Sequence, residues 1–276
     1  NNSGVELLEA TTGDEQELLE LVAPVDGILT CWKAVTASTI SQAQNCKCIG
    51  RYGIGLDNID VEEATKEGIL VTNVPSFCIE EVSDHAMALM LSCARKITTY
   101  SHAIKQGAYD LSLGIPITRL RGKTIGILGW GKIGRSLGKR ARVFGLRVIA
   151  CDPQIHPEKI AQEGVELVSF EDLLKQSDFI SIHAPLTPDT QHLFGWEAFQ
   201  HMKRTAFIIN TSRGDIVDTV ALQKALDGKL IAGAALDVLP QEPPALDSPL
   251  LKHERTIITP HAAFYSEESL MELRVT

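Results

Sequence analysis

The sequence predicts an α/β protein with two domains built on parallel sheets, and three observations lead to this prediction. The chain has 276 residues, which exceeds one average domain of roughly 100 to 200 residues. Short apolar runs alternate with helical patterns along almost the whole chain, as in successive β-α-β units. Glycine occurs 21 times while aromatic residues make up only 5%, a balance that favours glycine-rich strand–helix turns over an all-β sandwich.

The first third of the chain contains short apolar runs that we expect to form strands, at residues 5–9, 26–31, 48–52 and 69–72. Helical stretches at 14–22 and 60–66 lie between them. A longer helical pattern follows from about Ile79 to Ile97, with an apolar stripe at helical spacing made of Val82, Ala86, Leu89, Met90 and Cys93. This pattern indicates a helix that joins two domains or packs against a partner.

A second domain begins after this helix. The loop at 106–121 is rich in glycine, proline and turn residues, so we place the domain boundary near residue 98. Beyond it, strands are expected at 124–128, 146–150, 179–183, 206–210, 232–236 and 256–258. Six strands joined by helices predict a doubly wound sheet over residues 99–265.

Composition excludes several classes of function. The formal net charge of −9 lacks the positive field that binding to nucleic acid requires. No apolar stretch approaches the roughly 18 residues that span a bilayer, so we expect no membrane association. Six cysteines are scattered without metal-ligand spacing, and of these only Cys46 and Cys48 are close. We therefore expect no metal site and a reducing cytoplasm.

The most informative local motif is the run Gly129-Trp-Gly131-Lys-Ile-Gly134, which follows an apolar strand and opens a helix. In the dinucleotide-binding fingerprint the first glycine permits a tight turn, the second lets the backbone approach a pyrophosphate, and the third lets the helix lie close to the strand. The helix N-terminus then offers N–H groups to the phosphates. The motif predicts a dinucleotide site; the alternative is an ordinary glycine turn.

An acidic residue follows the second strand of this domain where a ribose-binding carboxylate belongs. Asp152 lies about 20 residues beyond the glycine turn, and a carboxylate there accepts hydrogen bonds from the ribose hydroxyls and repels a 2′-phosphate. No arginine follows to bind such a phosphate. We expect NAD rather than NADP, the alternative being a surface aspartate.

Three polar residues follow three predicted strands in the C-terminal half, namely Arg213, Glu242 and His261. Hydride chemistry on a 2-oxo acid needs a cation for the carboxylate, a proton donor at the carbonyl and a group that tunes the donor. The arginine fork suits a carboxylate, and a carboxylate beside imidazole favours its protonated form. Taken singly, the arginine could be ion-paired, the glutamate solvated and the histidine structural; only their conjunction with a nucleotide fold favours catalysis.

Together these motifs resemble the D-isomer-specific 2-hydroxyacid dehydrogenases, over nearly the whole chain and in the same order. The segments Asp57–Asp60 and Pro260–Glu268 are most similar to the phosphoglycerate-dehydrogenase and C-terminal-binding-protein branches. The motifs that carry the resemblance are Arg51–Asp60, the glycine turn with Asp152, His183–Thr187, Asn210–Gly214, Leu236–Val238, Glu242 and Thr259–His261.

The resemblance implies an NAD-dependent oxidoreductase that transfers hydride between NAD(H) and a small D-2-hydroxy acid or 2-oxo acid. It implies that Arg213, Glu242 and His261 are catalytic. The implied cofactor-binding residues are Gly129, Gly131, Lys132, Ile133, Gly134, Asp152, Pro185, Thr187, Thr211 and Asp237. The implied substrate-binding residues are Arg51, Ile54, Gly55, Arg213 and Phe264.

The family fold implies two Rossmann-like doubly wound domains with an interdomain cleft. On that template residues 1–98 and 266–276 form the substrate-binding domain, truncated at both ends, and the helix from Ile79 implies a homodimer. Two alternatives stay open: a regulatory protein that senses NAD(H), and a dehydrogenase for a phosphorylated acid such as 3-phosphoglycerate, for which Arg51 would supply charge. Ile54 and Phe264 depart from the C-terminal-binding-protein pattern, which has serine and tryptophan there.

Overall fold

The computed structural model describes residues 4–275. Residues 1–3 and 276, which the sequence assigned to the substrate-binding domain, lie outside this range. The chain forms two compact units, which we call unit 1 and unit 2. Unit 1 holds the described residues up to Phe77 and from Glu267 on, and unit 2 holds Cys78–Ser266.

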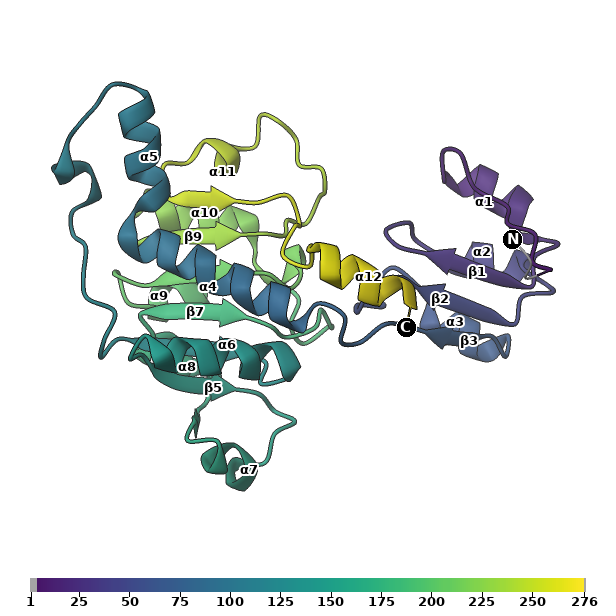
Figure 1. Cartoon of the computed structure of the whole chain (residues 1–276), viewed down its shortest axis with the longest axis horizontal. Coiled ribbons are helices and arrows are strands. Elements are labelled where there is room, and N and C mark those ends of the chain that lie inside the picture. The colour runs from purple at the N-terminus through teal and green to yellow at the C-terminus, as the bar shows by residue number, and fades with distance from the viewer. Residues whose placement is uncertain (1–3, 276) are drawn as a thin grey trace. The chain divides into compact units, whose positions relative to one another are not determined.

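Unit 1 is built on a three-stranded parallel sheet in which the strands follow one another in chain order (Figure 1). Residues 5–9, expected as a strand, form none; the other expected strands are present. The strands are β1 (Gly27–Thr30), β2 (Cys48–Arg51) and β3 (Leu70–Thr72). The helices are α1 (Glu15–Val22), α2 (Ala37–Gln42), α3 (Val61–Lys66) and α12 (Glu267–Val275).

The core of unit 1 lies on one side of this sheet, where Ile40, Ile49 and Ala64 are buried between strand and helices. The short helices begin at side-chain caps: Asp14 accepts a hydrogen bond from the Glu17 N–H at 2.9 Å, and Asp60 accepts one from the Glu63 N–H at 2.9 Å. All three strands point their carboxyl ends to the same edge, so the loop after β2 lies at that edge.

Unit 2 contains a seven-stranded parallel sheet in the order β10-β9-β8-β7-β4-β5-β6. The chain reverses direction across the sheet between β4 and β7, which is the topological switch point of a doubly wound fold. The strands are β4 (Thr124–Leu128), β5 (Arg147–Cys151), β6 (Glu166–Leu167), β7 (Phe179–Ile182), β8 (Phe207–Asn210), β9 (Gly233–Leu236) and β10 (Thr256–Ile258). β6 is the strand that the sequence reading missed.

Helices cover both faces of this sheet. The helical elements of unit 2 are α4 (Ile79–Arg95), α5 (Ile97–Lys105), η1 (Leu111–Gly114), α6 (Lys132–Val143), α7 (Pro157–Gln162), α8 (Phe170–Gln176), α9 (Trp196–His201), η2 (Gly214–Ile216), α10 (Thr219–Asp227) and α11 (Pro249–Lys252). α4 and α6 share one core with the sheet, while α8, α9 and α10 share the other. Consecutive residues of β4, Ile127 and Leu128, belong to opposite cores.

The position of α4 explains why the compact units divide between Phe77 and Cys78 rather than near residue 98. All five residues of the predicted apolar stripe of α4 are buried, and α4 contacts α6, β8 and β9. The helix thus belongs to the core of unit 2. The expected helix from about Ile79 to Ile97 is confirmed as α4. It ends before Lys96, whose φ is 55°, and α5, which was not expected, follows.

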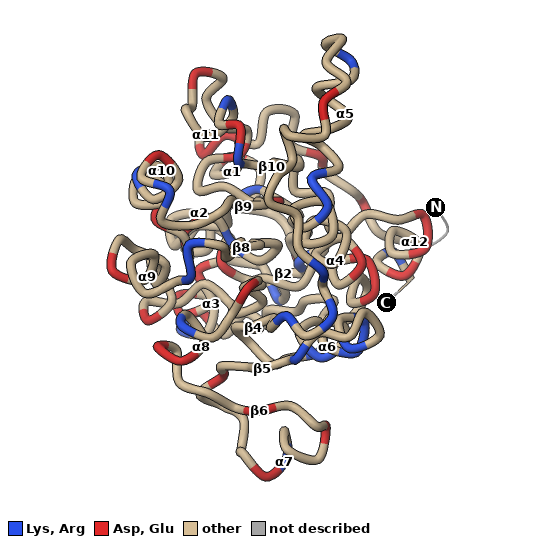
Figure 2. Tube along the Cα trace, turned by 90° about the vertical axis from the view of Figure 1, so that its left-hand side faces the viewer, with Lys and Arg blue, Asp and Glu red and all other residues tan. Residues whose placement is uncertain are grey.

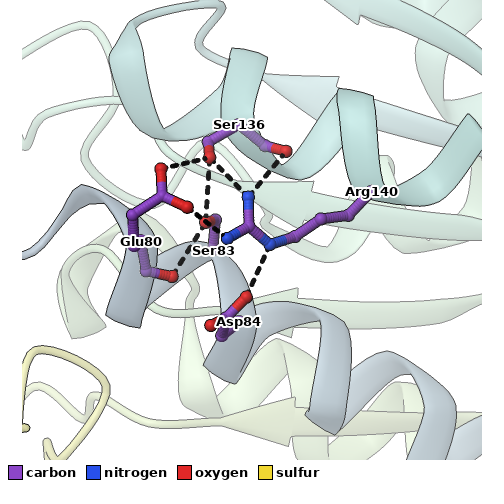
Figure 3. Close-up of polar contacts among 5 residues, drawn as sticks. All are labelled: Glu80, Ser83, Asp84, Ser136 and Arg140. Atoms are coloured by element: carbon purple, nitrogen blue, oxygen red, sulfur yellow. Dashed lines mark hydrogen bonds and ion pairs between the residues drawn. The ribbon is translucent and has the colours of Figure 1, made fainter.

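A cluster of polar side chains joins α4 to α6 (Figure 3). Arg140 Nε donates to Asp84 at 2.5 Å, and Arg140 Nη2 donates to Glu80 at 2.5 Å. Arg140 Nη1 and Ser83 Oγ both donate to Ser136 Oγ. We call these five residues the Arg140 cluster.

Charge is unevenly distributed on unit 2. α6 carries five basic residues and no acidic one, and its blue segments stand out in Figure 2. The phosphate-binding turn predicted from the sequence lies at the N-terminal end of this helix. Among the helices of residues 4–275, none is both long and apolar enough to cross a bilayer.

Candidate active site

The glycine turn lies at the carboxyl end of β4, beside the switch point. Gly129 has a φ of 90°, and a Cβ there would lie 2.7 Å from the Ala184 nitrogen. A Cβ on Gly134 would lie 2.2 Å from the Gly129 oxygen. Gly131 is the N-cap of α6, and no atom lies within 4 Å of the place that its Cβ would occupy. The turn is therefore tight on the protein side and open above the helix N-terminus, which fits the approach of a phosphate.

Asp152 follows β5 and contacts this turn directly. Its Oδ2 accepts a hydrogen bond from the Trp130 N–H at 2.8 Å, and its Oδ1 accepts one from the Gln154 N–H at 2.9 Å. The carboxylate is therefore fixed beside the phosphate turn at the distance in sequence that the fingerprint requires. Trp130, between the first two glycines, donates its indole Nε1–H to Glu163 at 3.2 Å.

The loop after β7 carries the expected residues Pro185 and Thr187. Thr190 Oγ1 donates to the Pro185 carbonyl at 2.7 Å and accepts a hydrogen bond from the Thr187 N–H at 2.8 Å. At the start of the loop, burial lowers the pKa of His183 to about 4, so its imidazole is neutral at physiological pH. Ser181 Oγ lies 2.9 Å from His183 Nε2.

The loop after β8 carries Arg213 on a rigid turn. Asn210 is completely buried; its Nδ2 donates to the Arg213 carbonyl at 2.8 Å and its Oδ1 accepts from the Ser212 N–H at 3.0 Å. Arg213 Nη1 donates to the Ser212 carbonyl at 2.7 Å. Thr211 Oγ1 is buried and has no hydrogen-bond partner among the described residues. Sequence analysis did not recognise the structural task of Asn210.

Glu242 and His261, which follow the neighbouring strands β9 and β10, are in direct contact. His261 Nδ1 lies 2.6 Å from Glu242 Oε2, and Glu242 Oε1 accepts the Leu239 N–H at 2.8 Å. The His261 backbone has a φ of 52°, in the left-handed region that costs about 1–2 kcal/mol for a residue with a Cβ. The Phe264 ring meets the His261 ring edge-on, with centroids 6.3 Å apart.

Asp237 fixes the segment that carries His261. Its carbonyl accepts the His261 N–H at 2.8 Å, while its carboxylate accepts the N–H groups of Ala262 at 3.0 Å and Ala263 at 2.9 Å. Thr259 Oγ1 donates to the same carboxylate at 2.5 Å. His85, on α4, lies 3.0 Å from that hydroxyl through Nε2. We call this group of five residues the Asp237 cluster. It consists of the side chains of Asp237, Thr259 and His85 and the N–H groups of Ala262 and Ala263.

The Asp237 carboxylate is ionised although it is buried. Burial alone would raise the pKa of this group, but the contact with His85 and the hydrogen bonds from Thr259 and the N–H groups of the two alanines outweigh it. The pKa of Asp237 is lowered to about 2 as a result. Sequence analysis missed His85, although its position between Val82 and Leu89 on the apolar stripe was a signal, since a polar residue there needs a partner.

The predicted substrate residues Arg51, Ile54 and Gly55 lie in unit 1, where Arg51 ends β2 and Ile54 and Gly55 lie on the loop that follows. Arg51 Nη1 donates to the Tyr52 carbonyl at 2.6 Å, and its guanidinium lies 5.9 Å from the centroid of the Trp32 ring. Asn73 Nδ2 donates to the Ile54 carbonyl at 2.6 Å and so holds the loop. Trp32 and Asn73 had no assigned task in the sequence analysis.

Comparisons with known proteins give the family. The profile described as "D-isomer specific 2-hydroxyacid dehydrogenase, NAD binding domain" matches residues 87–263. A glyoxylate reductase of Korarchaeum cryptofilum is 41% identical over 260 residues, which cover 91% of this chain and 77% of that relative. A D-3-phosphoglycerate dehydrogenase of Methanocaldococcus jannaschii is 42% identical over 265 residues, 95% of this chain and 50% of the relative, so the chain spans half of that length.

A solved structure of a D-2-hydroxy acid dehydrogenase is similar to this chain as well. The D-lactate dehydrogenase from Aquifex aeolicus, complexed with NAD and lactic acid, has a TM-score of 0.87 and 30% sequence identity; the match covers 93% of this chain and 81% of that one. The chain belongs to the D-isomer-specific 2-hydroxyacid dehydrogenase family. It is an NAD-dependent oxidoreductase, and the family predicted from the sequence is confirmed.

Proposed function

We propose that this protein reduces a small 2-oxo acid to the D-2-hydroxy acid, with His261 as the proton donor. The observation that carries the proposal is the 2.6 Å contact of His261 Nδ1 with Glu242 Oε2, at the ends of neighbouring strands. A carboxylate at Nδ1 orients the ring and stabilises the imidazolium, so the proton leaves from the opposite nitrogen, Nε2. Arg213, after the next strand of the sheet, holds the substrate carboxylate.

Atoms and charges balance in this scheme. When bound, NADH supplies the hydride that reduces C2 of the substrate. His261 Nε2 gives its proton to the carbonyl oxygen, which becomes the hydroxyl. The His261 ring becomes neutral in this step, and Glu242 keeps it in place. In the oxidation of a hydroxy acid, His261 takes the hydroxyl proton.

The cofactor site that we propose extends from the glycine turn to the end of β9. Gly129 and Gly134 close the turn, while Gly131, Lys132 and Ile133 at the start of α6 would hold the pyrophosphate. Three features of the structure support the fit: the open space above Gly131, the fixed Asp152 carboxylate and the unpartnered hydroxyl of Thr211. The other residues of the proposed site are Pro185, Thr187 and Asp237. Asp152 gives the site its preference for NAD over NADP.

For unit 1 we propose the task of binding the substrate. The loop at Ile54 and Gly55 offers backbone groups to a carboxylate. In unit 2 we propose a substrate-binding task for Phe264, whose ring meets the His261 ring edge-on. A second candidate substrate is a phosphorylated hydroxy acid, because Arg51 adds a cation to that loop. Six of the relatives are named as D-3-phosphoglycerate dehydrogenases, which agrees with this candidate.

A homodimer is also proposed, with α5 and η1 as the contact. Six apolar residues of this segment are about half exposed or more, and none of the α5 residues is buried. These residues are Ile97, Ile104, Tyr109, Leu111, Leu113 and Ile115. The segment extends away from the sheet of unit 2 (Figure 1), so a second copy of the chain supplies the apolar cover that its own unit does not.

All six cysteines are free, which agrees with a reducing compartment such as the cytoplasm.

One assay tests the proposed reaction. Oxidation of NADH is followed with glyoxylate, pyruvate, hydroxypyruvate and 3-phosphohydroxypyruvate, and again with NADPH. The proposal predicts turnover of at least one unphosphorylated acid with NADH in preference to NADPH. A strict requirement for the phosphorylated acid would favour the second candidate, and no turnover of any acid would contradict both.

A further inference from the structure

The middle of α4 directs an imidazole toward the ends of β9 and β10. His85 Nε2 lies 3.0 Å from Thr259 Oγ1 and 3.4 Å from Asp237 Oδ1. About a quarter of the His85 side chain is exposed, whereas the Asp237 side chain is completely buried. The proposed reaction gives His85 no task.

The direction of these hydrogen bonds follows from the number of protons. An ionised carboxylate only accepts, so the single proton of the Thr259 hydroxyl points at Asp237 Oδ1, 2.5 Å away. In its contact with His85, Thr259 Oγ1 must therefore be the hydrogen-bond acceptor. His85 Nε2 carries a hydrogen and donates it, which makes a chain of donors from His85 through Thr259 to Asp237.

This chain ends at the backbone of the proposed proton donor. Asp237 binds the N–H groups of three successive residues, one through its carbonyl and two through its carboxylate. The first of the three is His261, whose left-handed backbone persists only if its surroundings hold it. Oδ2 of Asp237 accepts one hydrogen bond, from Ala263, among the described residues, so it retains capacity for a second donor. An amide on the cofactor is such a donor.

We propose that His85 is a positioning residue for hydride transfer: its Nε2–H fixes the Thr259–Asp237 pair, which sets the orientation of His261 and of the carboxylate that receives the nicotinamide amide. This inference rests on the proposed tasks of Asp237 and His261. It adds a residue from α4, a helix that carries none of the proposed catalytic groups.

Four variants separate positioning from general stability. His85→Gln keeps an N–H donor within similar reach, and His85→Leu removes the donor at similar volume. His253→Leu is the matched control, because His253 Nε2 lies 3.5 Å from Asp227 Oδ1 in the same unit and its side chain is 12% exposed. Thr259→Val removes the same chain of donors from its middle and serves if His85→Leu does not fold.

Two readouts are taken with NADH and the best 2-oxo acid, below the melting temperature of every variant: kcat, and the deuterium isotope effect on kcat with NADH labelled at the transferred position. We expect His85→Leu to lower kcat about tenfold and to raise the isotope effect, because misplaced groups slow the hydride step. Thr259→Val should do the same, and the double variant should lose no more than either alone. His85→Gln should stay within about twofold of wild type, and His253→Leu should change neither readout.

Three results would overturn the inference: an unchanged kcat and isotope effect in both His85→Leu and Thr259→Val, a His85→Gln variant as poor as His85→Leu, or an equal loss in His253→Leu. His261→Ala distinguishes this failure from that of the proposed function. Near wild-type turnover in His261→Ala overturns the proposed function itself. Loss of turnover there, with His85→Leu unchanged, overturns the present inference alone.

Discussion

The two polar clusters that α4 makes, the Asp237 cluster and the Arg140 cluster, differ in burial and in what they hold. The Asp237 side chain is completely buried, whereas those of Glu80 and Asp84 are 69% and 66% exposed. The first cluster fixes the backbone of the proposed proton donor, and the second joins two helices. Water can replace the lost partner of an exposed carboxylate but not that of a buried one. Of these two contacts of the same helix, we therefore expect only the buried one to affect the chemistry.

The largest effect is expected when the buried cluster is broken. Asp237→Asn places an amide NH₂ where a carboxylate oxygen accepts the N–H of Ala262 or of Ala263, so we expect the free energy of unfolding to fall by about 3 kcal/mol. Turnover should fall about 100-fold because the segment that carries His261 loses a hydrogen bond at Ala262 or Ala263. Urea denaturation and steady-state kinetics measure both. Asp215→Asn, at a carboxylate whose side chain is 40% exposed, is the control; a stability loss below 1 kcal/mol in Asp237→Asn would remove the contrast between the clusters.

An intermediate effect is expected at Asp152, whose carboxylate binds two N–H groups but faces the proposed ribose site. Asp152→Ala should lower the ratio of kcat/KM for NADH to that for NADPH at least tenfold, because the charge that repels a 2′-phosphate is gone. Stability should fall by about 1 kcal/mol. An unchanged cofactor ratio would refute the assignment of Asp152.

The third prediction concerns how the free energy of unfolding depends on pH below neutrality, which His183 influences. The unfolded chain takes up a proton at this imidazole below pH 6.5, whereas the folded protein keeps it neutral until about pH 4. The unfolded state thus binds more protons in this window, and stability falls as the pH drops through it. His183→Asn should flatten the dependence of the unfolding free energy between pH 6.5 and 5. An unaltered slope would show that His183 takes up its proton in the folded state.

The smallest effect is expected at the exposed cluster. Arg140→Gln should cost about 1 kcal/mol or less and leave turnover unchanged, since Glu80 and Asp84 remain hydrated. The loss should be smaller still in 1 M salt, which screens the wild-type ion pairs. A drop in turnover like that of Asp237→Asn would mean that the two clusters act as one.

The sequence predicted the parts of unit 2 that depend on apolar runs and glycine geometry. β4 was placed at Thr124–Leu128 because an apolar run precedes the glycine turn, and all five residues are buried in the structure, as is typical of a parallel strand. The contact of His261 with Glu242 could be anticipated, since the carboxyl ends of neighbouring parallel strands share an edge.

Other features depend on tertiary packing that no local pattern encodes. β6 is two residues long, too short for any periodic signal. The start of α5 after Lys96 was not expected, because a left-handed lysine has no sequence mark of the kind that glycine gives. The boundary was placed too late because the apolar stripe of α4 shows that the helix is buried, but not against which unit.

The most direct test of the account is the rate of hydride transfer in His261→Ala. Stopped-flow measurement with saturating NADH and the preferred 2-oxo acid isolates this step from product release. The account predicts a rate at least 100-fold below wild type, with NADH binding retained because the glycine turn is untouched. His201→Ala, at an exposed histidine on α9, should match wild type. A transfer rate in His261→Ala close to that of wild type would contradict the claim that His261 is the proton donor.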